Sequence, residues 1–503
     1  MRTTLLLDIA ADAAGDRIAV DTPGGGLTFE ALQRRAQAAG RWLADTGAAH
    51  VLFIGLNGPI LPVLFFASGY AGLPFVPLNY RLPDTDLRRL IERTAPAAVV
   101  IDDDMAARIA GMDGVTIVRA GEFSARFLEG PPASAAAPDN PENESDIAVL
   151  LFTSGTTGEP KAAVLRHGNL TSYVMSTVEF LGCDEGEAAL VSVPPYHIAG
   201  ISAILTSVYG GRRIVYLPAF TAEAWVETCA AANVTHAMVV PTMLDRILDV
   251  MARSGESLPS LRALSYGGGR MPQSVITRAL EMLPKVDFVN AYGLTETSST
   301  VALLGAEDHR AALASADPLV RRRLGSVGRP LPTLELEIRD DEGRVCSAGE
   351  RGEIFVRGDQ VSGEYLHRKA IADDGWFATN DAGWLDTDGY LFVEGRLDDV
   401  IVRGGENISP GEIEEALRAC DGVADVAVLG LPDEVWGEKV AAVLVCYGPP
   451  VDCEALAAHV RKTLRSARTP ESWHFRDSLP YNETGKLLRR VLKAELAGLS
   501  ATP

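Results

Sequence analysis

The chain has 503 residues, of which 47% are hydrophobic and 22% are charged, and its net charge is −21. This composition excludes a largely disordered chain, and the length predicts two or three domains of roughly 100–200 residues each. We expect no nucleic-acid partner, because binding a phosphate backbone requires clustered lysines and arginines, and the basic clusters of this acidic chain are short.

The cysteines and the apolar segments indicate the compartment. Six cysteines occur without a CxxC pair or a His/Cys spacing typical of zinc sites, which predicts reduced thiols. The first ten residues lack the basic start and the long apolar stretch of a signal peptide. Residues 60–78 are apolar but contain three prolines and two glycines, so a buried helix followed by a strand is favoured over a membrane span. We therefore expect a cytoplasmic protein without a membrane span.

The first third of the chain alternates between predicted helices and strands. Apolar side chains at helical spacing predict a helix within residues 27–45, after a turn of three glycines. Apolar strands follow at 50–55 and 97–101, with a helical stretch at 84–94 between them. This alternation favours an α/β architecture with largely parallel sheets. Residues 121–146 are rich in Ala, Pro, Glu and Asp, and are predicted to form a surface connection.

The pattern changes in the last third of the chain. From about residue 325 to 395, short strands with turn signals, such as 334–339 and 352–357, predict a small β-rich module. A final α/β segment begins near residue 398. Its expected helices lie at 411–419 and 452–465, and its expected strands at 424–429 and 440–447.

A loop rich in hydroxyl groups and glycines follows an apolar strand and ends in a lysine. It runs from Thr153 to Lys161 with the sequence TSGTTGEPK. Glycines let the backbone approach a polyphosphate and turn its N–H groups inward, and Lys161 adds a cation that can neutralise phosphate charge. The Walker pattern is not satisfied. A flexible surface loop is the alternative, because Ser, Thr and Gly are common in loops.

This loop resembles the phosphate-loop signature of the adenylate-forming superfamily, which contains acyl-CoA synthetases, luciferases and the adenylation domains of peptide synthetases. The resemblance covers nearly the whole chain, because further motifs of the family occur in the right order. They are PPYHIAG at 194–200, YGGGRMP at 266–272, NAYGLTET at 290–297, TNDAGWLD at 379–386, GRLDDVIVRGGENISPGEIE at 395–414 and NETGK at 482–486.

The resemblance implies an α/β fold with two domains. Residues 1–396 are expected to form a large N-terminal domain of stacked α/β sheets, which includes the β-rich module as a small β-barrel. Residues 397–503 are expected to form a smaller, mobile α+β domain.

The resemblance also assigns an ATP site. Asp381 matches the aspartate that binds ribose, Arg396 matches an arginine that contacts ribose or phosphate, and Tyr292 offers a face on which adenine can stack. The family usually has Thr-Gly-Asp where this chain has Thr-Asn-Asp at 379–381, a departure that keeps the carboxylate. A surface salt bridge is the alternative for Arg396. The other assigned positions are Thr153, Ser154, Gly155, Thr156, Thr157, Gly158, Lys161, Gly267, Gly268, Gly269, Asn290, Ala291 and Gly293.

Three further residues are expected to act on the phosphates. Glu296, beside Thr295, is expected to bind Mg²⁺, which prefers hard oxygen ligands; helix capping by either residue is the alternative. Lys486 matches the lysine that lowers the repulsion between substrate carboxylate and α-phosphate during adenylation. Without the resemblance, Lys486 would be interpreted as a solvated charge.

The C-terminal motifs imply a second half-reaction. In the family the small domain rotates, which withdraws the motif lysine and presents the 395–410 loop for thiol transfer. Asp398 matches the hinge. The residues expected to line the thiol tunnel are Gly404, Gly405, Glu406 and Asn407. Trp436 resembles an aromatic residue that stacks on the adenine of coenzyme A, with ordinary packing as the alternative.

The acyl side is predicted from the PPYHIAG motif. His197 matches a histidine that gates or orients the carboxylate, with a packed core histidine as the alternative. No aspartate lies between 194 and 202, which disfavours an α-amino acid substrate. Small residues in this motif should leave an apolar cavity for a fatty chain or an aryl ring. The pocket is expected to include Tyr196, Ala199, Gly200 and Tyr266.

These features together predict an ATP-dependent acyl-CoA synthetase that uses ATP, Mg²⁺ and coenzyme A. One alternative is a ligase that loads an acyl carrier protein, because residues 466–472 hold a single cation where coenzyme A-binding relatives often have several. A luciferase-like oxygenase is a second alternative. A nucleotide-binding protein without catalysis is a third, and the intact Lys161, Glu296, Asp381 and Lys486 argue against it.

Overall fold

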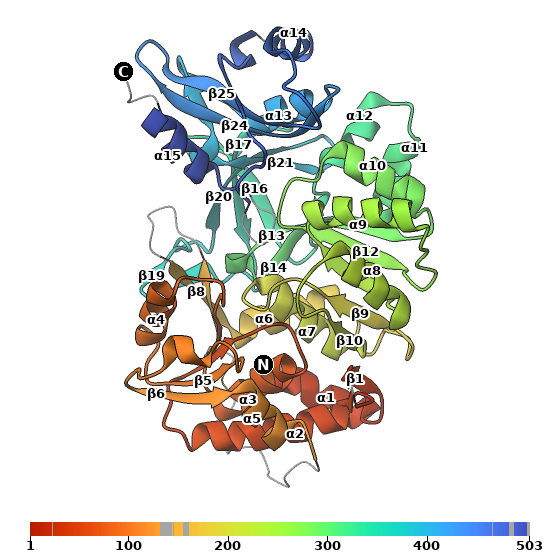
Figure 1. The fold of residues 1–503 in the computed structure, drawn as a ribbon, viewed down its shortest axis with the longest axis vertical. Helices are drawn as coiled ribbons and strands as arrows, with labels where there is room; N and C mark the ends of the chain where they lie inside the picture. Colours follow the sequence, from red (N-terminus) through yellow and green to blue (C-terminus); the bar gives the residue numbers. More distant parts are fainter. Residues whose placement is uncertain are drawn as a thin grey trace.

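The computed structural model describes residues 1–22, 24–130, 143, 145–153, 160–464, 466–481 and 487–499. The chain runs from a helix-rich base, which contains the N-terminus, to a separate α/β unit at the top, near the C-terminus (Figure 1). Four β-sheets account for this layout. The predicted α/β fold with largely parallel main sheets is confirmed.

The first main sheet has eight strands in the order β19-β18-β8-β7-β4-β3-β5-β6. Its strands from β6 to β7 run parallel, whereas β8 and β18 are antiparallel additions at one edge. The strands are β3 (His50–Ile54), β4 (Phe75–Pro77), β5 (Ala97–Ile101), β6 (Val115–Arg119), β7 (Ile147–Thr153), β8 (Lys161–Arg166), β18 (Glu364–Tyr365) and β19 (Arg368–Lys369).

Helices cover both faces of this sheet, so its central strands are apolar along their whole length. On β3, Val51 and Phe53 belong to the core on one face, while Leu52 and Ile54 belong to the core on the other. The covering helices are α1 (Thr4–Ala14), α2 (Phe29–Ala44), α3 (Ile60–Ala71), α4 (Asp84–Glu92) and α5 (Ala120–Phe127).

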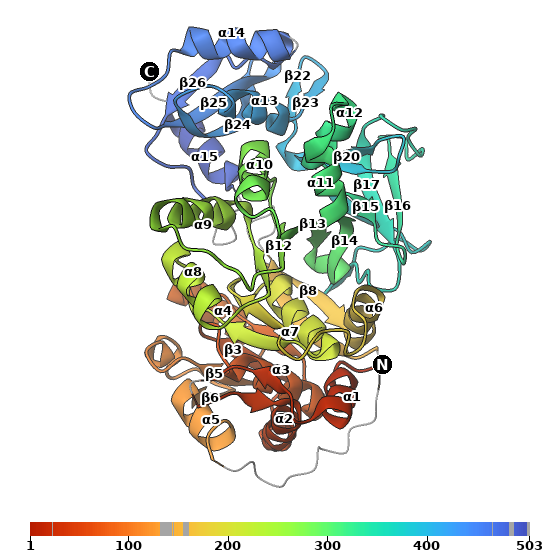
Figure 2. The ribbon, with the colours of Figure 1, turned by 90° about the vertical axis from the view of Figure 1, so that its right-hand side faces the viewer.

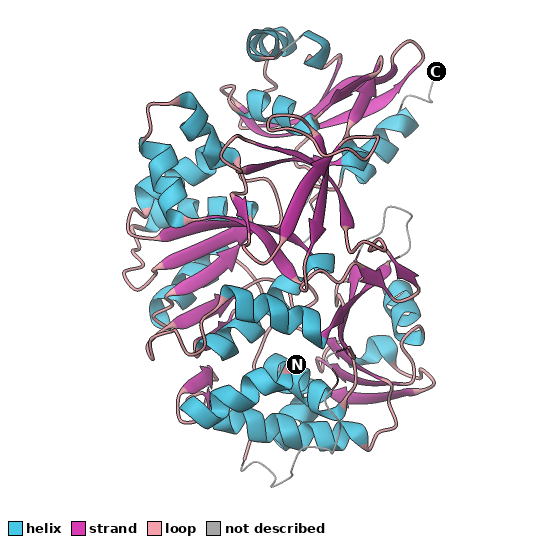
Figure 3. Cartoon of the chain, turned by 180° about the vertical axis from the view of Figure 1, so that it is seen from behind, coloured by secondary structure: helices cyan, strands magenta, loops and turns pink. Residues whose placement is uncertain are grey.

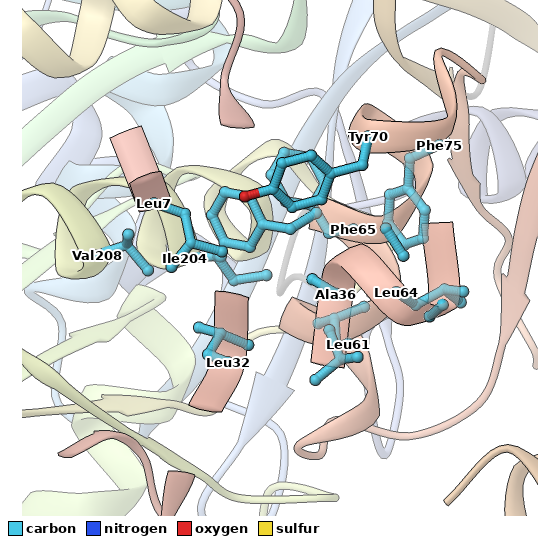
Figure 4. Packing of buried hydrophobic residues seen from close by; sticks show 14 of the residues in the cluster. Leu7, Leu32, Ala36, Leu61, Leu64, Phe65, Tyr70, Phe75, Ile204 and Val208 are labelled. Atoms are coloured by element: carbon cyan, nitrogen blue, oxygen red, sulfur yellow. The ribbon is translucent and has the colours of Figure 1, made fainter. Parts of the chain in front are cut away.

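Helix α3 lies at the centre of the first core. Its Leu61, Leu64 and Phe65 meet side chains of α1, α2 and α7 (Ile198–Gly210), as Figure 4 shows. The predicted buried helix followed by a strand is therefore confirmed for residues 60–78. No helix in the described part of the chain combines the length and apolarity that a membrane span needs.

The second main sheet has nine strands in the order β15-β14-β13-β12-β11-β9-β10-β1-β2. The strands are β1 (Ile18–Val20), β2 (Leu27–Thr28), β9 (Ala188–Val191), β10 (Arg213–Tyr216), β11 (His236–Val239), β12 (Ala263–Gly267), β13 (Asp287–Leu294), β14 (Ser299–Leu304) and β15 (Arg329–Pro330). The remaining helices of this half are α6 (His167–Thr177), α8 (Ala222–Ala231), α9 (Pro241–Ser254), α10 (Gln273–Met282), α11 (Ala306–Ala314) and α12 (Pro318–Arg321). Because β9 to β13 run parallel, their carboxyl ends share one edge, where α/β folds bind ligands.

The β-rich module contains a four-stranded antiparallel sheet in the order β16-β17-β20-β21. Its strands are β16 (Glu335–Arg339), β17 (Gly352–Arg357), β20 (Phe377–Leu385) and β21 (Leu391–Arg396). In the described residues no ladder joins β16 to β21, so the expected barrel is an open sheet. Its open side is filled by Val301 and Ala302 of β14, and the short β18 and β19 leave the module to join the first sheet. Figure 3 shows these strands between the helix-covered sheets below and the C-terminal unit above.

The C-terminal unit has its own sheet and its own cores, both drawn from Ile401 onward. Its strands are β22 (Ile401–Arg403), β23 (Glu406–Ile408), β24 (Val423–Asp433), β25 (Gly437–Cys446) and β26 (Ser472–Phe475), and its helices are α13 (Pro410–Arg418), α14 (Cys453–Thr463) and α15 (Arg489–Leu499). Helix α13 faces the larger part of the molecule (Figure 2). There, Glu412 pairs with Arg351 at 3.2 Å, and Glu415 pairs with Arg270.

The predicted surface connection at 121–146 is wrong at its start. Residues 120–127 form α5, because Phe123 and Phe127 stand four residues apart and bury one helical stripe. Both rings pack against Trp42, with centroids 6.3 and 5.6 Å away. Residues 131–142 lie outside the described part of the chain.

Candidate functional site

The predicted ribose-binding residues form a clamp where the second main sheet meets the β-rich module. Asp381 on β20 lies opposite Arg396 on β21, and the Arg396 Nε atom is 3.0 Å from Asp381 Oδ1. The Tyr292 hydroxyl, from β13, donates to Asp381 Oδ2 at 2.7 Å. Asp381 is only 7% exposed. The carboxylate is thus held from both sides in one orientation, as pre-organised binding requires.

This clamp changes what Tyr292 can do. Burial and the neighbouring Asp381 raise the pKa of the Tyr292 hydroxyl well above its ordinary value, so it acts as a fixed hydrogen-bond donor. Arg396 also donates to the carbonyl oxygen of Thr379 at 2.8 Å. Arg396 does form a salt bridge, but its partner, Asp381, is buried, so the pair is not an ordinary surface salt bridge.

Glu296 is fixed at the junction of the two main sheets. It lies in a short 3-10 turn, η2 (Thr295–Thr297), directly after β13. The Tyr365 hydroxyl, from β18, donates to Glu296 Oε1 at 2.7 Å. The other carboxylate oxygen has no protein partner among the described residues, so a hard oxygen donor remains that fits Mg²⁺. The hydroxyl of Thr297 caps this turn and bonds Leu294, so capping does not explain Thr295 or Glu296.

Tyr365 was missed in the sequence analysis. Burial, followed by the charge of Glu296, raises the pKa of its hydroxyl. The Lys161 Nζ atom lies 5.8 Å from the centroid of its ring, within reach of a cation–π interaction. Tyr365 therefore connects the residue expected to bind metal with the lysine of the phosphate loop. The sequence carries no pattern that points to Tyr365, because its strand, β18, has only two residues and so short a strand shows no periodicity.

The described residues of the phosphate loop form the base of a hairpin. Thr153 ends β7 and lies opposite Lys161, which begins β8, and the Thr153 hydroxyl donates to the Lys161 carbonyl at 3.4 Å. The predicted loop residues Ser154, Gly155, Thr156, Thr157 and Gly158 lie outside the described part of the chain.

The glycines of the predicted nucleotide site differ in what restricts these positions to glycine. A Cβ atom on Gly267 would lie 2.3 Å from the Ala291 carbonyl oxygen, and one on Gly293 would lie 1.7 Å from that of Ser299. Both are required by close strand packing. Gly268, at φ +77°, and Gly269 are exposed beyond the end of β12, where a flat base could approach.

Asn290 can contribute little more than its backbone to a nucleotide site. Its side chain is buried, and its amide donates to the Ser326 carbonyl at 3.0 Å. Ala291, half-buried, pairs with Gly267 across β12 and β13. The predicted nucleotide strip is therefore formed mainly by backbone.

The predicted acyl residues are split between two environments. His197 precedes α7, and desolvation by its surroundings lowers its pKa to about 4, so the imidazole is neutral at pH 7. Its ring lies 4.8 Å from that of Tyr196, and among the described residues its side chain has no hydrogen-bond partner. Ala199 and Gly200 lie in the first turn of α7, beside this ring pair.

Tyr266, which is predicted to belong to the acyl pocket, has a buried side chain. The side chain is fully buried in the core beneath α9 and α10, and its hydroxyl is 2.7 Å from His309 Nε2. Alternation along β12 turns Tyr266 toward the helices. Only its backbone remains available on the ligand side.

The predicted thiol-tunnel residues form the hairpin between β22 and β23. Gly404 and Gly405 have φ values of +57° and +84°, and the Gly404 N–H donates to the Trp436 carbonyl at 2.8 Å. A Cβ atom on Gly404 would lie 2.9 Å from the Trp436 ring, so glycine permits this packing. Trp436 is still 46% exposed. Glu406 and Asn407 complete the hairpin.

Asp398, the predicted hinge residue, lies in an exposed 3-10 turn, η4 (Leu397–Asp399), between the two units. Its neighbour Asp399 lies 3.6 Å from Arg489, at the start of α15. Arg489, Asp399 and Arg396 line one small cavity of about 20 Å³. Lys486, three residues before Arg489, lies outside the described part of the chain.

Comparisons with known proteins agree with this geometry. Residues 7–366 match the family model described as "AMP-binding enzyme", and residues 412–486 match "AMP-binding enzyme C-terminal domain". The chain belongs to the AMP-binding enzyme family. The predicted resemblance to the adenylate-forming superfamily is therefore confirmed.

Two family members that are similar to this chain are acid–thiol ligases. The chain is 34% identical over 482 residues to a feruloyl-CoA synthase of an Amycolatopsis species, with 94% of each chain covered. It is 30% identical over 498 residues to the fatty acid–[acyl-carrier-protein] ligase ScoC of Streptomyces coeruleorubidus, covering 96% of this chain and 94% of that one.

Solved structures of acid–thiol ligases are also similar to this chain. o-Succinylbenzoate CoA synthetase of Bacillus subtilis, in complex with its acyl-adenylate intermediate, superposes with a TM-score of 0.83 at 28% identity, and 98% of each chain is covered. The same enzyme with ATP and a magnesium ion also has a TM-score of 0.83, at 29% identity over 97% of this chain and 99% of that one. The predicted AMP-forming acid–thiol ligase, with ATP, Mg²⁺ and coenzyme A, is confirmed at the level of the family.

Proposed function

We propose that this protein is an ATP-dependent acyl-CoA synthetase with the activity divided between two domains, residues 1–396 and 397–503. A carboxylic acid reacts with ATP to give an acyl-adenylate and pyrophosphate, and coenzyme A then gives the thioester and AMP. Two groups of side-chain contacts carry this proposal, and both lie where the three sheets of the larger domain meet. In one group Arg396 and Tyr292 hold Asp381. In the other, Tyr365 contacts both Glu296 and Lys161.

The first half-reaction needs two anions to be brought together. A carboxylate oxygen bonds to the α-phosphorus as the bond from that phosphorus to pyrophosphate breaks. Asp381 and Arg396 would hold the ribose, Lys161 would compensate the phosphates, and Glu296 would hold Mg²⁺, which supplies further compensation of phosphate charge when bound. A neutral His197 fits this step, since it can orient the carboxylate without a strong ion pair that would weaken its attack.

We assign the present domain arrangement to this first half-reaction. Arg489, near Lys486 in sequence, lines the same cavity as Arg396 of the ribose clamp. The 404–407 hairpin instead packs on Trp436 of its own domain. Rotation about Asp398 would move the Lys486 segment away from the nucleotide site and bring the 404–407 hairpin toward it, as thiol transfer requires.

The acid is proposed to be a fatty or an aryl acid. The segment 194–202 lacks a carboxylate that could bind an α-amino group, and small residues open α7 beside His197. The similarity to a feruloyl-CoA synthase favours aryl acids. We place the reaction in the cytoplasm, because all six cysteines are free thiols, as expected in a reducing compartment.

A second candidate is transfer to an acyl carrier protein. Arg468, the one cation of the 466–472 stretch, is already paired with Glu412, and Glu471 pairs with Arg403 at 2.6 Å. The nucleotide phosphates of coenzyme A would find little free positive charge there. A carrier protein presents pantetheine without that nucleotide, and a carrier-protein ligase is similar over 96% of the chain.

Pyrophosphate release distinguishes these functions. We expect acid-dependent release from ATP-Mg²⁺ with a fatty or aryl acid, and faster turnover when coenzyme A is added. Release that stops near one equivalent with coenzyme A, but turns over with a phosphopantetheinylated carrier protein, would favour the second candidate. Release that no acid stimulates would contradict both.

A further inference from the structure

Asn380 stands where the family motif usually has glycine, and the structure shows a reason. Its φ is +60°, a conformation that glycine adopts freely and that asparagine tolerates better than most residues. It lies on a β-bulge, because Ala378 and Ala382 face Phe355 and Glu353 across the sheet. The Asn380 N–H donates to Glu353 Oε1 at 2.9 Å. A glycine could make the same backbone turn, so the side chain needs its own explanation.

The side chain reaches the hinge. Asn380 Nδ2 donates to Asp398 Oδ2 at 3.0 Å, across the turn η4. On the other side of that turn, Asp399 pairs with Arg489, which is itself held by the buried Glu414. The two adjacent carboxylates of the hinge are therefore held from opposite sides, one by the larger domain and one by the smaller.

We propose that Asn380 is a positioning residue that stabilises the adenylation orientation through Asp398. This inference rests on the proposed function, in which rotation about Asp398 separates the two half-reactions. Rotation changes the backbone angles at Asp398, so the hydrogen bond to a residue fixed in β20 would break. A relative with glycine at this position would lack this restraint, and this chain should favour the first orientation more strongly.

The expected effect is modest, because the bond is exposed. A hydrogen bond to a charged group in such a position shifts an equilibrium by about 3- to 10-fold. Asn380→Gly keeps the left-handed backbone and removes only the amide. Two rates are measured: thioester formation from supplied acyl-adenylate and coenzyme A, and adenylation as single-turnover pyrophosphate release. Asn380→Gly should raise the ratio of the first rate to the second by about 3- to 10-fold. Hydrogen exchange of residues 396–403 should accelerate by a similar factor.

A matched control separates the hinge bond from the change to glycine. Asn233 also has a positive φ, +49°, and its side chain accepts from Ser260, away from the hinge. Asn233→Gly should leave both the ratio and the exchange of 396–403 unchanged. Asn380→Asp should shift both further than Asn380→Gly, because two carboxylates would then face each other.

The outcomes are separable. Unchanged hinge exchange in Asn380→Gly would overturn the inference whether or not the protein is active. Faster exchange with an unchanged ratio of half-reactions would leave Asn380 a structural contact and overturn its positioning role. If the wild-type protein releases no pyrophosphate with any acid, the proposed function fails, and hinge exchange alone decides whether Asn380 restrains Asp398. Additive effects of Asn380→Gly and Asp398→Ala on exchange would also contradict a direct bond.

Discussion

The nucleotide side and the thiol side of this molecule are held in very different ways. Asp381 is 7% exposed and is bonded by two side chains from two different sheets. Trp436 is 46% exposed and its neighbour Val435 is 79% exposed, at the turn between β24 and β25, where the Trp436 ring packs on Gly404 of the same domain. The difference indicates that the first site is pre-organised, and it supports our proposal that the second is completed by domain rotation.

The strongest test of the pre-organised side is Asp381→Asn. The amide loses the charge that pairs with Arg396 and can accept from Tyr292 only by turning its NH₂ group toward Arg396. We expect the KM for ATP to rise about 10- to 100-fold, the usual range for a hydrogen bond to a charged group. Steady-state pyrophosphate release at varied ATP measures this effect. A change below 2-fold would show that the clamp does not bind ribose.

The neutral state of His197 should be visible in the pH dependence of stability. Its folded-state pKa, about 4, lies below the ordinary 6.5, so its contribution is fully present above pH 6.5 and is lost as the pH falls toward 4. In urea unfolding, wild type should lose ~1–2 kcal/mol more than His197→Gln between pH 7.5 and pH 5. An equal loss in both proteins would show that the histidine titrates normally.

Tyr365→Phe tests the link between Glu296 and the phosphate loop. The variant keeps the ring beneath Lys161 but removes the hydroxyl that orients Glu296. We expect adenylation to fall about 3- to 10-fold at low Mg²⁺ and to recover partly at high Mg²⁺.

Tyr390→Phe is the matched control for that variant. It breaks a similar bond, in which the Tyr390 hydroxyl donates to Asp308 at 2.6 Å, outside the predicted nucleotide-site residues. An equal loss in both variants would assign the effect of Tyr365→Phe to stability.

The smallest effect is expected on the thiol side. Trp436→Ala should raise the KM for coenzyme A by up to about 10-fold and leave the rate of adenylation unchanged, because an exposed aromatic ring stacks weakly. Val435→Ala, at an exposed neighbouring position, should change neither quantity. An unchanged KM for coenzyme A in Trp436→Ala would leave this side chain with its packing role on Gly404.

The sequence predicts the regular parts of the fold well and the contacts of the site poorly. The buried segment 60–78 and the helices of the C-terminal unit follow from apolar spacing, which is local. Helix α5 was missed because its composition resembles a linker, although two phenylalanines at helical spacing were present.

The directions of two tyrosine side chains show why the contacts of the site are hard to predict. Tyr266 is predicted to belong to the site and Tyr365 is not, because the face of a strand that a side chain occupies is decided by neighbours far away in sequence. Tyr266 turns into the core to meet His309, and Tyr365 turns toward Glu296. The bond from Asn380 to Asp398 likewise depends on a bulge that no local pattern specifies.

The most direct test of the two-orientation account is Lys486→Ala, with the two half-reactions measured separately. Lys486 lies outside the described residues, and its role comes from the NETGK motif. We expect adenylation to fall about 10²- to 10³-fold, the loss typical of one electrostatic partner of the transition state, while thioester formation from supplied acyl-adenylate and coenzyme A continues at the wild-type rate. An equal loss in both half-reactions would contradict the division of the activity between two domain orientations.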